Sequence, residues 1–465
     1  MLRLYNSLTR KVEPLDLNQE SVKLYTCGPT VYDFVTVGNW RTYVLSDWVI
    51  RSLKYFGHQV DFIMNITDVG HLTGDNLGDS SSGEDRQENA AKREGKSAWD
   101  VADFYTKDFL GGFEELNLIN PIKFAKATEY INEQIELVKI IETKGYTYQI
   151  TDGIYFDTIK YESKGNTYGQ LSTLDKIKEG SRVETNPEKK DPRDFALWKF
   201  SPKEGKRQME WDSPWGVGFP GWHIECSAMI MAELGDQVDV HIGGEDLRST
   251  HHPNEIAQSE AATGKAPFVK HWIHGAFLTV DGGRMGKSLG NAYTLKDIIE
   301  KGYTPMDLRY FYLTGHYRKQ LNFTWEALES AQQSLLKMKQ TLVRAEDSTD
   351  KNHNSPKRYE EKFALSLSDD LNLPEALATT WEVIKSGLPS AVKKGLIAKF
   401  DTVLGLYLVD SSQLPIPADV SQLLDNRNLL RKEGKFEEAD KVRLEIEKAG
   451  FMIEDTSEGS RLIKT

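Results

Sequence analysis

Residues 22–66 contain the stretch from which the architecture follows: VKLYTC at 22–27, RTYVLSDWVIRSLKYF at 41–56 and VDFIMNI at 60–66. The two short apolar runs are typical of buried strands, whereas apolar residues recur at helical spacing in the segment between them. A strand, a helix and a second strand in this order predict a βαβ unit, and hence an α/β fold with a parallel sheet. Cys27 and Thr67 then follow neighbouring strands at the carboxyl edge, where open α/β sheets bind ligands.

The α/β pattern returns later in the chain, after an interruption. Helical periodicity over 100–145 gives way at 146–215 to short strands and polar turns, which indicates an insertion within the sheet domain. Beyond it we expect a strand at 238–244, a helix from about Asn254 and a strand at 268–280. The polar segment 75–95, with Leu77 as its only large apolar residue, predicts a mobile surface loop.

The chain beyond Gly302 has a helical pattern with breaks at 345–357 and 410–417. These breaks predict a helical bundle followed by a small terminal module. The expected domains are 1–115 and 219–303 for the two halves of the sheet domain, 116–218 for the insertion, 304–410 for the bundle and 418–465 for the module.

Composition excludes several classes of protein. The chain has 465 residues and a net charge of -12, which argues against nucleic-acid binding over the whole surface but allows a local basic path. It contains no apolar stretch long enough to span a membrane and no apolar signal segment at its start, so we expect a cytoplasmic protein. Two cysteines cannot supply a disulfide framework for a fold of this size.

Both cysteines belong to a set of residues that suits zinc. His251 and Glu255 are four positions apart and share one face of a helix, and Cys27 at its strand end could face the same crevice as Cys226. Two thiolates, an imidazole and a carboxylate form a chemically sensible zinc shell. The alternative is a pair of buried small side chains beside an ordinary His and Glu. The surrounding histidine-rich segments, PGWHIECSAM and HIGGEDLRSTHHPNE, favour the metal site.

Two glycine-containing segments could bind a nucleotide. Residues 27–42, CGPTVYDFVTVGNWRT, lead from the first strand into the helix, where Gly38 permits close backbone approach and the helix N-terminus suits phosphate. Residues 280–291, VDGGRMGKSLGN, place basic side chains on a glycine-rich loop suited to a triphosphate. The alternatives are a turn that binds nothing and a plain hairpin with solvated charges. One phosphate site built from both segments requires the fold to bring them together.

Six motifs in one order resemble those of the cysteinyl-tRNA synthetase family of class I aminoacyl-tRNA synthetases. They are CGPTVYD at 27–33, NITD at 65–68, PGWHIECSAM at 220–229, HIGGEDL at 241–247, HHPNEIAQSEA at 251–261 and GKSLGN at 286–291. The resemblance implies a Rossmann-like catalytic domain split by a connective insertion, then an α-helical bundle and a small C-terminal anticodon-recognition module.

The resemblance also implies roles for single residues. The positions of the family's ligands to one zinc ion are held by Cys27, Cys226, His251 and Glu255, and those of its cysteine pocket by Thr67, Trp222, His241 and Asp246. Asp246 is the candidate partner of the substrate ammonium group. ATP with Mg²⁺ would be bound by Thr36, Gly38, Asn39, Arg284, Lys287 and Ser288, of which Lys287, Arg284 and Thr36 would act in catalysis. A zinc ion with an open position can bind the substrate thiolate, and a hydroxyl is a poorer ligand, so serine would be rejected without editing.

Two signatures depart from the family pattern. Thr36, Val37, Gly38 and Asn39 stand where a His-Ile-Gly-His-like tetrad is usual, so the leading histidine that contacts ATP phosphates is missing. Arg284, Met285, Gly286, Lys287 and Ser288 stand for the usual Lys-Met-Ser-Lys-Ser. Loss of one donor to developing charge predicts slower adenylation, by about 10² to 10³ in rate, unless the Thr36 hydroxyl recovers part of it. The same hydroxyl could instead cap the following helix.

The implied reaction is ATP-dependent activation of L-cysteine and its transfer to the 3′ end of tRNA(Cys), by a monomer that contacts no membrane. In the terminal module, Arg427 and Arg431 would contribute to a basic face and Phe436 would stack on an anticodon base. The alternative is that Phe436 packs in the core of the module. Two other functions stay open: an ATP-dependent ligase that joins cysteine to a small amine, whose relatives lack a terminal module, and a non-catalytic zinc- or RNA-binding relative.

Overall fold

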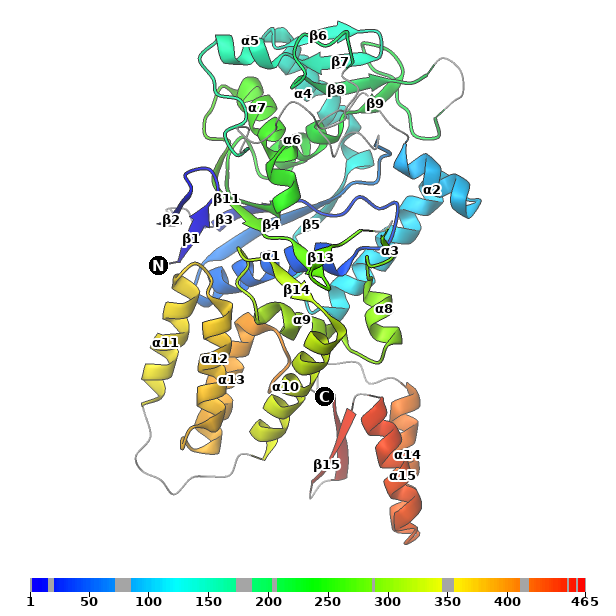
Figure 1. Cartoon of the computed structure of the whole chain (residues 1–465), viewed down its shortest axis with the longest axis vertical. Coiled ribbons are helices and arrows are strands. Elements are labelled where there is room, and N and C mark those ends of the chain that lie inside the picture. The colour runs from blue at the N-terminus through cyan, green and yellow to red at the C-terminus, as the bar shows by residue number, and fades with distance from the viewer. Residues whose placement is uncertain are drawn as a thin grey trace. The chain divides into compact units, whose positions relative to one another are not determined.

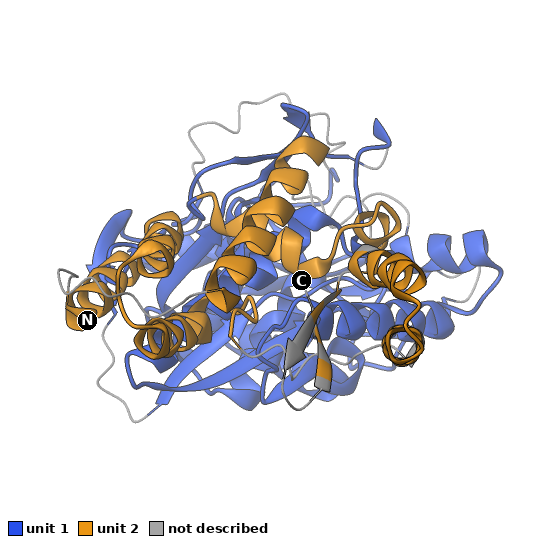
Figure 2. Ribbon diagram, turned by 90° about the horizontal axis from the view of Figure 1, so that it is seen from below, with its two compact units in different colours: residues 1–295, 316–323, 368–371 blue, residues 296–315, 324–367, 372–465 orange. Residues whose placement is uncertain are grey.

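The computed structural model describes residues 2–15, 21–71, 85–172, 186–202, 207–286, 289–344, 355–409, 418–449, 451–456 and 459–464. The chain forms two compact units (Figure 2). Unit 1 comprises Met1–Leu295, His316–Phe323 and Ser368–Leu371, and unit 2 comprises Lys296–Gly315, Thr324–Leu367 and Asn372–Thr465. Among the described residues, no helix is both long and apolar enough to cross a membrane.

A five-stranded parallel sheet forms the centre of unit 1 (Figure 1). Its strands lie in the order β11 (Val269–Gly275), β10 (Val238–Gly244), β3 (Ser21–Thr26), β4 (Gln59–Ile66) and β5 (Lys123–Lys126). Helix α1 (Val37–Tyr55) connects β3 to β4, which confirms the predicted βαβ unit, and α7 (His251–Thr263) connects β10 to β11. The strand order therefore reverses between β3 and β10, and ligands of open α/β sheets bind at this switch point.

Helices cover both faces of the sheet. In Figure 1, α1 lies on one side, and α6 (Trp222–Glu233) and α7 lie on the other. The buried strand residues Tyr25 and Trp272 belong to one apolar core with Met229 and Ile230 of α6. Strands covered on both faces read as continuous apolar runs, which is why the sequence indicates them so clearly.

Four described strands between Thr147 and Pro220 form a separate antiparallel sheet, in agreement with the short strands predicted for 146–215. Its order is β6 (Thr147–Ile150), β7 (Gly153–Phe156), β8 (Phe195–Phe200) and β9 (Gly218–Pro220). The 3₁₀ helix η2 (Ala127–Tyr130) and helices α4 (Ile131–Thr143) and α5 (Thr158–Ser163) accompany it. The helical prediction over 100–145 is wrong at β5, which extends the main sheet between α3 (Ala98–Glu115) and η2. Four residues, KFAK, carry too little alternation to indicate a strand.

Residues 86–94 form a helix, α2 (Arg86–Glu94), so the loop predicted for 75–95 is wrong there. Asp85 caps its N-terminus by accepting a hydrogen bond from the Glu88 amide at 2.9 Å, and Gly95 ends it with a φ of 64°. The helix buries Gln87 and two alanines, so it contains no large apolar side chain that would mark it in the sequence. The rest of the predicted loop, 75–84, lies outside the described residues.

The strand predicted at 268–280 is two strands in different sheets. β11 ends at Gly275, and β12 (Leu278–Val280) joins β13 (Gly283–Arg284) and β14 (Leu321–Phe323). The buried Arg41 of α1 donates to the carbonyls of Ala276 and Phe277, at 2.7 and 3.0 Å, where the chain leaves the main sheet. Local hydropathy gives no sign of this break, because the backbone carbonyls exposed there are satisfied by an arginine that is distant in the sequence. A hairpin of β1 (Arg3–Asn6) and β2 (Lys11–Pro14) completes the strands of unit 1.

Unit 2 contains the helical bundle and the terminal module, and its helical pattern is confirmed. Following α8 (Leu295–Glu300), the bundle helices are α9 (Pro305–Leu313), α10 (Trp325–Val343), α11 (Pro356–Ser368), α12 (Leu373–Lys385) and α13 (Ser390–Leu404). The module consists of α14 (Ala418–Lys432), α15 (Phe436–Lys448), β15 (Phe451–Thr456) and β16 (Gly459–Lys464). The predicted breaks fall mainly on 345–354 and 410–417, outside the described residues.

Candidate functional site

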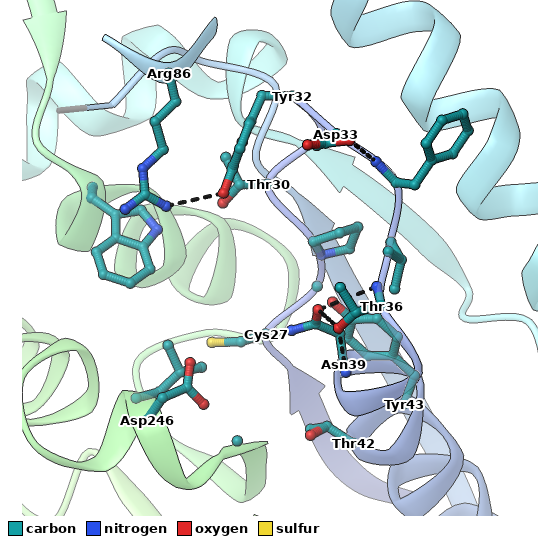
Figure 3. Close-up of a pocket in the computed structure, with 17 residues that line it drawn as sticks. Cys27, Thr30, Tyr32, Asp33, Thr36, Asn39, Thr42, Tyr43, Arg86 and Asp246 are labelled. Carbon is teal, nitrogen blue, oxygen red and sulfur yellow. Dashed lines mark hydrogen bonds between the residues drawn. The ribbon is translucent and has the colours of Figure 1, made fainter. Parts of the chain in front are cut away.

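A cavity of about 210 Å³ lies at the switch point (Figure 3). The turn from Cys27 to Asn39 forms one wall, and Trp222, Asp246 and Leu247 line another. Asp246 lies in the 3₁₀ helix η4 (Glu245–Arg248), directly after β10. Figure 3 shows the Cys27 sulfur pointing toward the Asp246 side chain, so a thiol and a carboxylate face the same space.

A larger cavity of about 690 Å³ adjoins the first and shares Thr36, Asn39, Trp222 and Asp246 with it. It is lined on one side by the start of α1 and on the other by residues 282–286. The Val37 amide donates to the Tyr293 carbonyl at 2.8 Å, and a Cβ on Gly38 would lie 3.3 Å from the Met285 side chain. The fold therefore brings together the two glycine-containing segments that the sequence left far apart.

Thr36 caps helix α1. Its Oγ1 donates to Asn39 Oδ1 at 2.7 Å and accepts from the Asn39 amide at 3.4 Å, while the Thr36 amide donates to Asn39 Oδ1 at 3.4 Å. This capping box satisfies the amides of Thr36 and Asn39 at the start of the helix. Thr36 therefore caps the helix and also lines both cavities.

The second glycine-containing segment is fixed by a residue that the sequence analysis did not single out. Arg284, Met285 and Gly286 line the larger cavity. Asn291 accepts from the Gly286 amide at 2.8 Å and donates through Nδ2 to the Arg284 carbonyl at 3.1 Å. An asparagine in a loop has no periodicity that would mark this role. The predicted ATP-binding residues Lys287 and Ser288 lie outside the described residues.

Four buried donor groups gather beneath the smaller cavity. They come from Cys27 after β3, Cys226 of α6, and His251 and Glu255 on one face of α7, and their donor atoms all lie within 4.8 Å of one another. The two sulfurs are 4.0 Å apart, and Cys27 Sγ lies 3.8 Å from Glu255 Oε1. Tetrahedral zinc with Zn–S bonds of about 2.3 Å sets its sulfurs about 3.8 Å apart. The spacing and the chemistry of these donors fit zinc.

A second, overlapping group shares two of these residues. Cys27 and Glu255 also lie with His241 and His252 in an arrangement that could hold a metal ion. His252 Nε2 is 3.5 Å from Cys27 Sγ, and its Nδ1 is hydrogen-bonded to His274 Nε2 at 2.7 Å. His241, which the resemblance assigns to the cysteine pocket, is fully buried, and its Nε2 lies 3.0 Å from Glu255 Oε2. The sequence analysis did not single out His252 or His274.

The charges of these groups are strongly coupled. Burial favours the neutral Glu255 carboxyl, yet the histidines His241 and His251 lower its pKa to about 2. Burial likewise favours a neutral His251, but the neighbouring carboxylate and the Cys226 thiolate raise its pKa to about 10. The pKa of Cys226 falls to about 7 despite burial, because Cys27 and His251 stabilise its thiolate. Burial, together with Cys226 and Glu255, raises the pKa of the Cys27 thiol well above its ordinary value. A cation bound to this buried cluster would therefore replace the protons that Cys27 and His251 hold at neutral pH.

The remaining residues predicted for the cysteine pocket lie in different places. The ring centroids of Trp222 and His251 are 4.3 Å apart. Trp222 and Asp246 both line the two cavities. Asp246 is exposed at the cavity wall, and partial removal of water by the surrounding protein raises the pKa of its carboxyl above the ordinary value. Thr67 lines neither described cavity. Its buried hydroxyl donates to Glu225 Oε2 at 3.2 Å.

Glu225 is a buried acid that sequence reasoning missed. Its Oε1 lies 2.8 Å from His71 Nε2, and its Oε2 accepts from Thr67. Burial, with the nearby Asp68, raises its pKa well above the usual range. Its position directly before Cys226 is the only signal in the sequence.

In the terminal module the predicted RNA-binding residues differ in exposure. The Phe436 side chain is 61% exposed, so the alternative that it packs in the module's core is wrong. Arg431 is exposed on α14. Arg427 is only 3% exposed and donates to Ser460 Oγ at 2.9 Å, so it holds β16 against α14 and is not presented to an RNA.

Comparison with known proteins gives concordant matches. A family model described as the tRNA synthetases class I (C) catalytic domain matches residues 13–333. The chain is 42% identical to a protein of Burkholderia lata named Cysteine--tRNA ligase 1, over 99% of this chain and 96% of that protein. It is 37% identical to the Cysteine--tRNA ligase of Treponema denticola, over 98% of each. Mycobacterium tuberculosis methionyl-tRNA synthetase with methionyl-adenylate shares the fold, with a TM-score of 0.56 at 14% identity over 84% of this chain and 89% of that one.

Proposed function

This chain belongs to the cysteine–tRNA ligase family of class I aminoacyl-tRNA synthetases, and on that premise we propose that it activates L-cysteine with ATP and transfers it to the 3′ end of tRNA(Cys), acting as a monomer. The observation that carries the proposal is the pair of adjoining cavities, one lined by Cys27 and Asp246 and the other by both glycine-containing segments.

Cysteine occupies the smaller cavity and ATP with Mg²⁺ the larger one. Asp246 lines both, so its carboxylate can hold the substrate ammonium group while the substrate carboxylate points toward the nucleotide. Trp222 lines both cavities, and its ring packs against that of His251. This arrangement fixes the attacking carboxylate and the α-phosphate side by side, which is the main requirement of such a reaction.

The phosphates lie between the turn at Thr36–Asn39 and the loop that begins at Arg284. As the cysteine carboxylate attacks the α-phosphate, Arg284 and Lys287 stabilise the negative charge and pyrophosphate leaves. The terminal ribose hydroxyl of tRNA then attacks the activated carbonyl and releases AMP. Zinc held by Cys27, Cys226, His251 and Glu255 would bind the substrate thiolate and so favour cysteine over serine.

The test is cysteine-dependent ATP–pyrophosphate exchange together with aminoacylation of a tRNA(Cys) transcript, on one preparation of measured zinc content. We expect both activities with cysteine and neither with serine. Exchange without charging would favour the small-amine ligase, and the absence of both from a zinc-loaded protein would favour the non-catalytic relative.

One substitution makes this test sharper. Asp246→Asn should raise the KM for cysteine in the exchange reaction by about 10- to 100-fold, because a charged hydrogen bond to the substrate ammonium group contributes about 1.5–3 kcal/mol. Asp236→Asn is the matched control, since Asp236 is a surface carboxylate paired with Lys265 at 2.7 Å and lines neither cavity. Equal kinetics for the two variants would contradict the role of Asp246.

A further inference from the structure

Another cavity lies within the helical bundle of unit 2. It has a volume of about 360 Å³ and is lined by Lys337, Gln340, Thr341 and Arg344 from the end of α10, Ile384 of α12 and Lys393 of α13. Three of these side chains are cationic and none is a carboxylate. In a chain whose net charge is -12, this concentration of positive charge is a local exception.

The most informative residue of this cavity is Lys393, because it is a buried cation. Its side chain is 7% exposed and lines the cavity, and the described residues provide no ion pair or hydrogen bond for its ammonium group. It also lies at the end of the first turn of α13, which contains no acidic residue, and the dipole of a helix N-terminus disfavours a cation there. A buried, unpaired cation in this position costs stability unless an anion binds beside it.

Two other lysines of the same bundle, unlike Lys393, have carboxylate partners. Lys362 pairs with Glu375 and Glu382 at 3.2 and 2.6 Å, and Lys399 pairs with Glu360 at 2.8 Å. Lys337 and Arg344, like Lys393, have no carboxylate partner among the described residues. Arg344 by itself is explained as the capping residue of α10, where a cation complements the helix dipole. That explanation does not extend to Lys393.

We propose that this cavity binds a phosphodiester group of the tRNA backbone. The proposal rests on the proposed function and assigns to the bundle a contact outside the cavities that would bind cysteine and ATP. The exposed Lys337 and Arg344 and the buried Lys393 line one cavity. A guanidinium group can donate two parallel hydrogen bonds to a phosphate. Because the contact is to the backbone, it positions the tRNA without reading its sequence.

The test compares Lys393→Gln with Lys394→Gln, since Lys394 is the neighbouring exposed lysine of α13 and does not line the cavity. Binding of a tRNA(Cys) transcript is measured between about 50 and 200 mM salt. Lys393→Gln should weaken binding by about fivefold to tenfold and reduce the slope of log K against log salt by up to about 1, whereas Lys394→Gln should change both much less. Cysteine-dependent pyrophosphate exchange should be equal in both variants.

Two further measurements keep the result decisive. Lys393→Arg should recover most of the tRNA affinity, because it restores the cation, and without tRNA the melting temperature of Lys393→Gln should equal or exceed that of the unmodified protein. Equal losses of affinity in the Lys393→Gln and Lys394→Gln variants, an unchanged salt slope, or a lower melting temperature with no rescue by arginine would each overturn the proposal. Failure of the unmodified protein to charge tRNA would instead refute the proposed function.

Discussion

Cys27 shows how much of the site depends on single buried side chains. Its sulfur lines the smaller cavity, lies 4.0 Å from Cys226 Sγ and 3.5 Å from His252 Nε2, and so belongs to both overlapping donor groups. His252 is in turn bound to His274, whose Nδ1 is 2.8 Å from Ser7 Oγ. Such a chain of hydrogen bonds orients a ring without requiring that it bind a metal ion.

Replacing residues that belong to only one donor group distinguishes the two. Cys226→Ser should reduce bound zinc from one ion per chain to a small fraction, because a serine hydroxyl is a poor zinc ligand. His252→Asn should retain zinc, since an amide nitrogen can still donate a hydrogen bond. The measurement is elemental analysis of zinc per chain after dialysis. Loss of zinc from His252→Asn and its retention in Cys226→Ser would assign the metal to His241 and His252 instead.

Among the residues of the candidate site, the sequence could indicate only those that lie within recognisable motifs. Cys226, His251 and Glu255 stand out through their spacing and their surroundings. Glu225 and His274 do not, because a buried acid or histidine is recognised only from the partner that satisfies it, here His71 and Ser7. Thr67 was assigned to the cysteine pocket, but its hydroxyl donates to Glu225, a partner that the sequence does not reveal.

At the scale of elements, prediction succeeded where burial on two faces leaves a long apolar run. β3, α1, β4 and β10 lie where the sequence places them, within a few residues. Helix α2 was missed because its ends are marked only by Asp85 and Gly95 and its core by two alanines. β5 was missed because four residues between helices take their conformation from the neighbouring strand, not from their own pattern.

Helix α13 offers a matched pair of glycines for a stability test. Gly405 caps it with a φ of 68°, and a Cβ there would lie 2.5 Å from Arg309 Nη2, which is fully buried. Gly395 is in the interior of the helix, and a Cβ at this position would have no neighbouring side chain within 4 Å among the described residues. Gly405→Ala should therefore destabilise the bundle by about 2 kcal/mol or more, and Gly395→Ala should stabilise it by about 0.5–1 kcal/mol. Thermal melting of the full chain measures both, and shifts in the same direction would contradict the argument.

At the scale of the whole molecule, the proposed function places catalysis in unit 1 and tRNA contacts in the terminal module. The terminal module has its own apolar core, formed by Val420, Val442, Ile446, Phe451 and Leu462, and Phe436 is not part of it. An exposed aromatic ring at the start of α15 is available for stacking on a base.

Substitution of this ring should separate the two activities. Phe436→Ala should raise the KM for tRNA(Cys) by about tenfold, because stacking on an aromatic ring contributes about 1–3 kcal/mol per base, and should leave pyrophosphate exchange unchanged. Leu429→Ala is the control, since Leu429 is also exposed in this module but has no aromatic ring. Aminoacylation and exchange kinetics provide the readout. Equal effects of the two substitutions, or a parallel loss of exchange, would show that Phe436 does not stack on tRNA.

The division of the chain into units has a consequence for its synthesis. Unit 1 takes its last residues from His316–Phe323 and Ser368–Leu371, and Asp370 accepts hydrogen bonds from the Tyr5 amide at 2.8 Å and from the Tyr317 hydroxyl at 2.6 Å. The first strand therefore acquires its final partner only after most of the bundle has been translated. A ribosome that has made residues 1–295 holds a nascent sheet whose N-terminal hairpin is incompletely anchored, so the earliest residues of the chain are among the last to be secured.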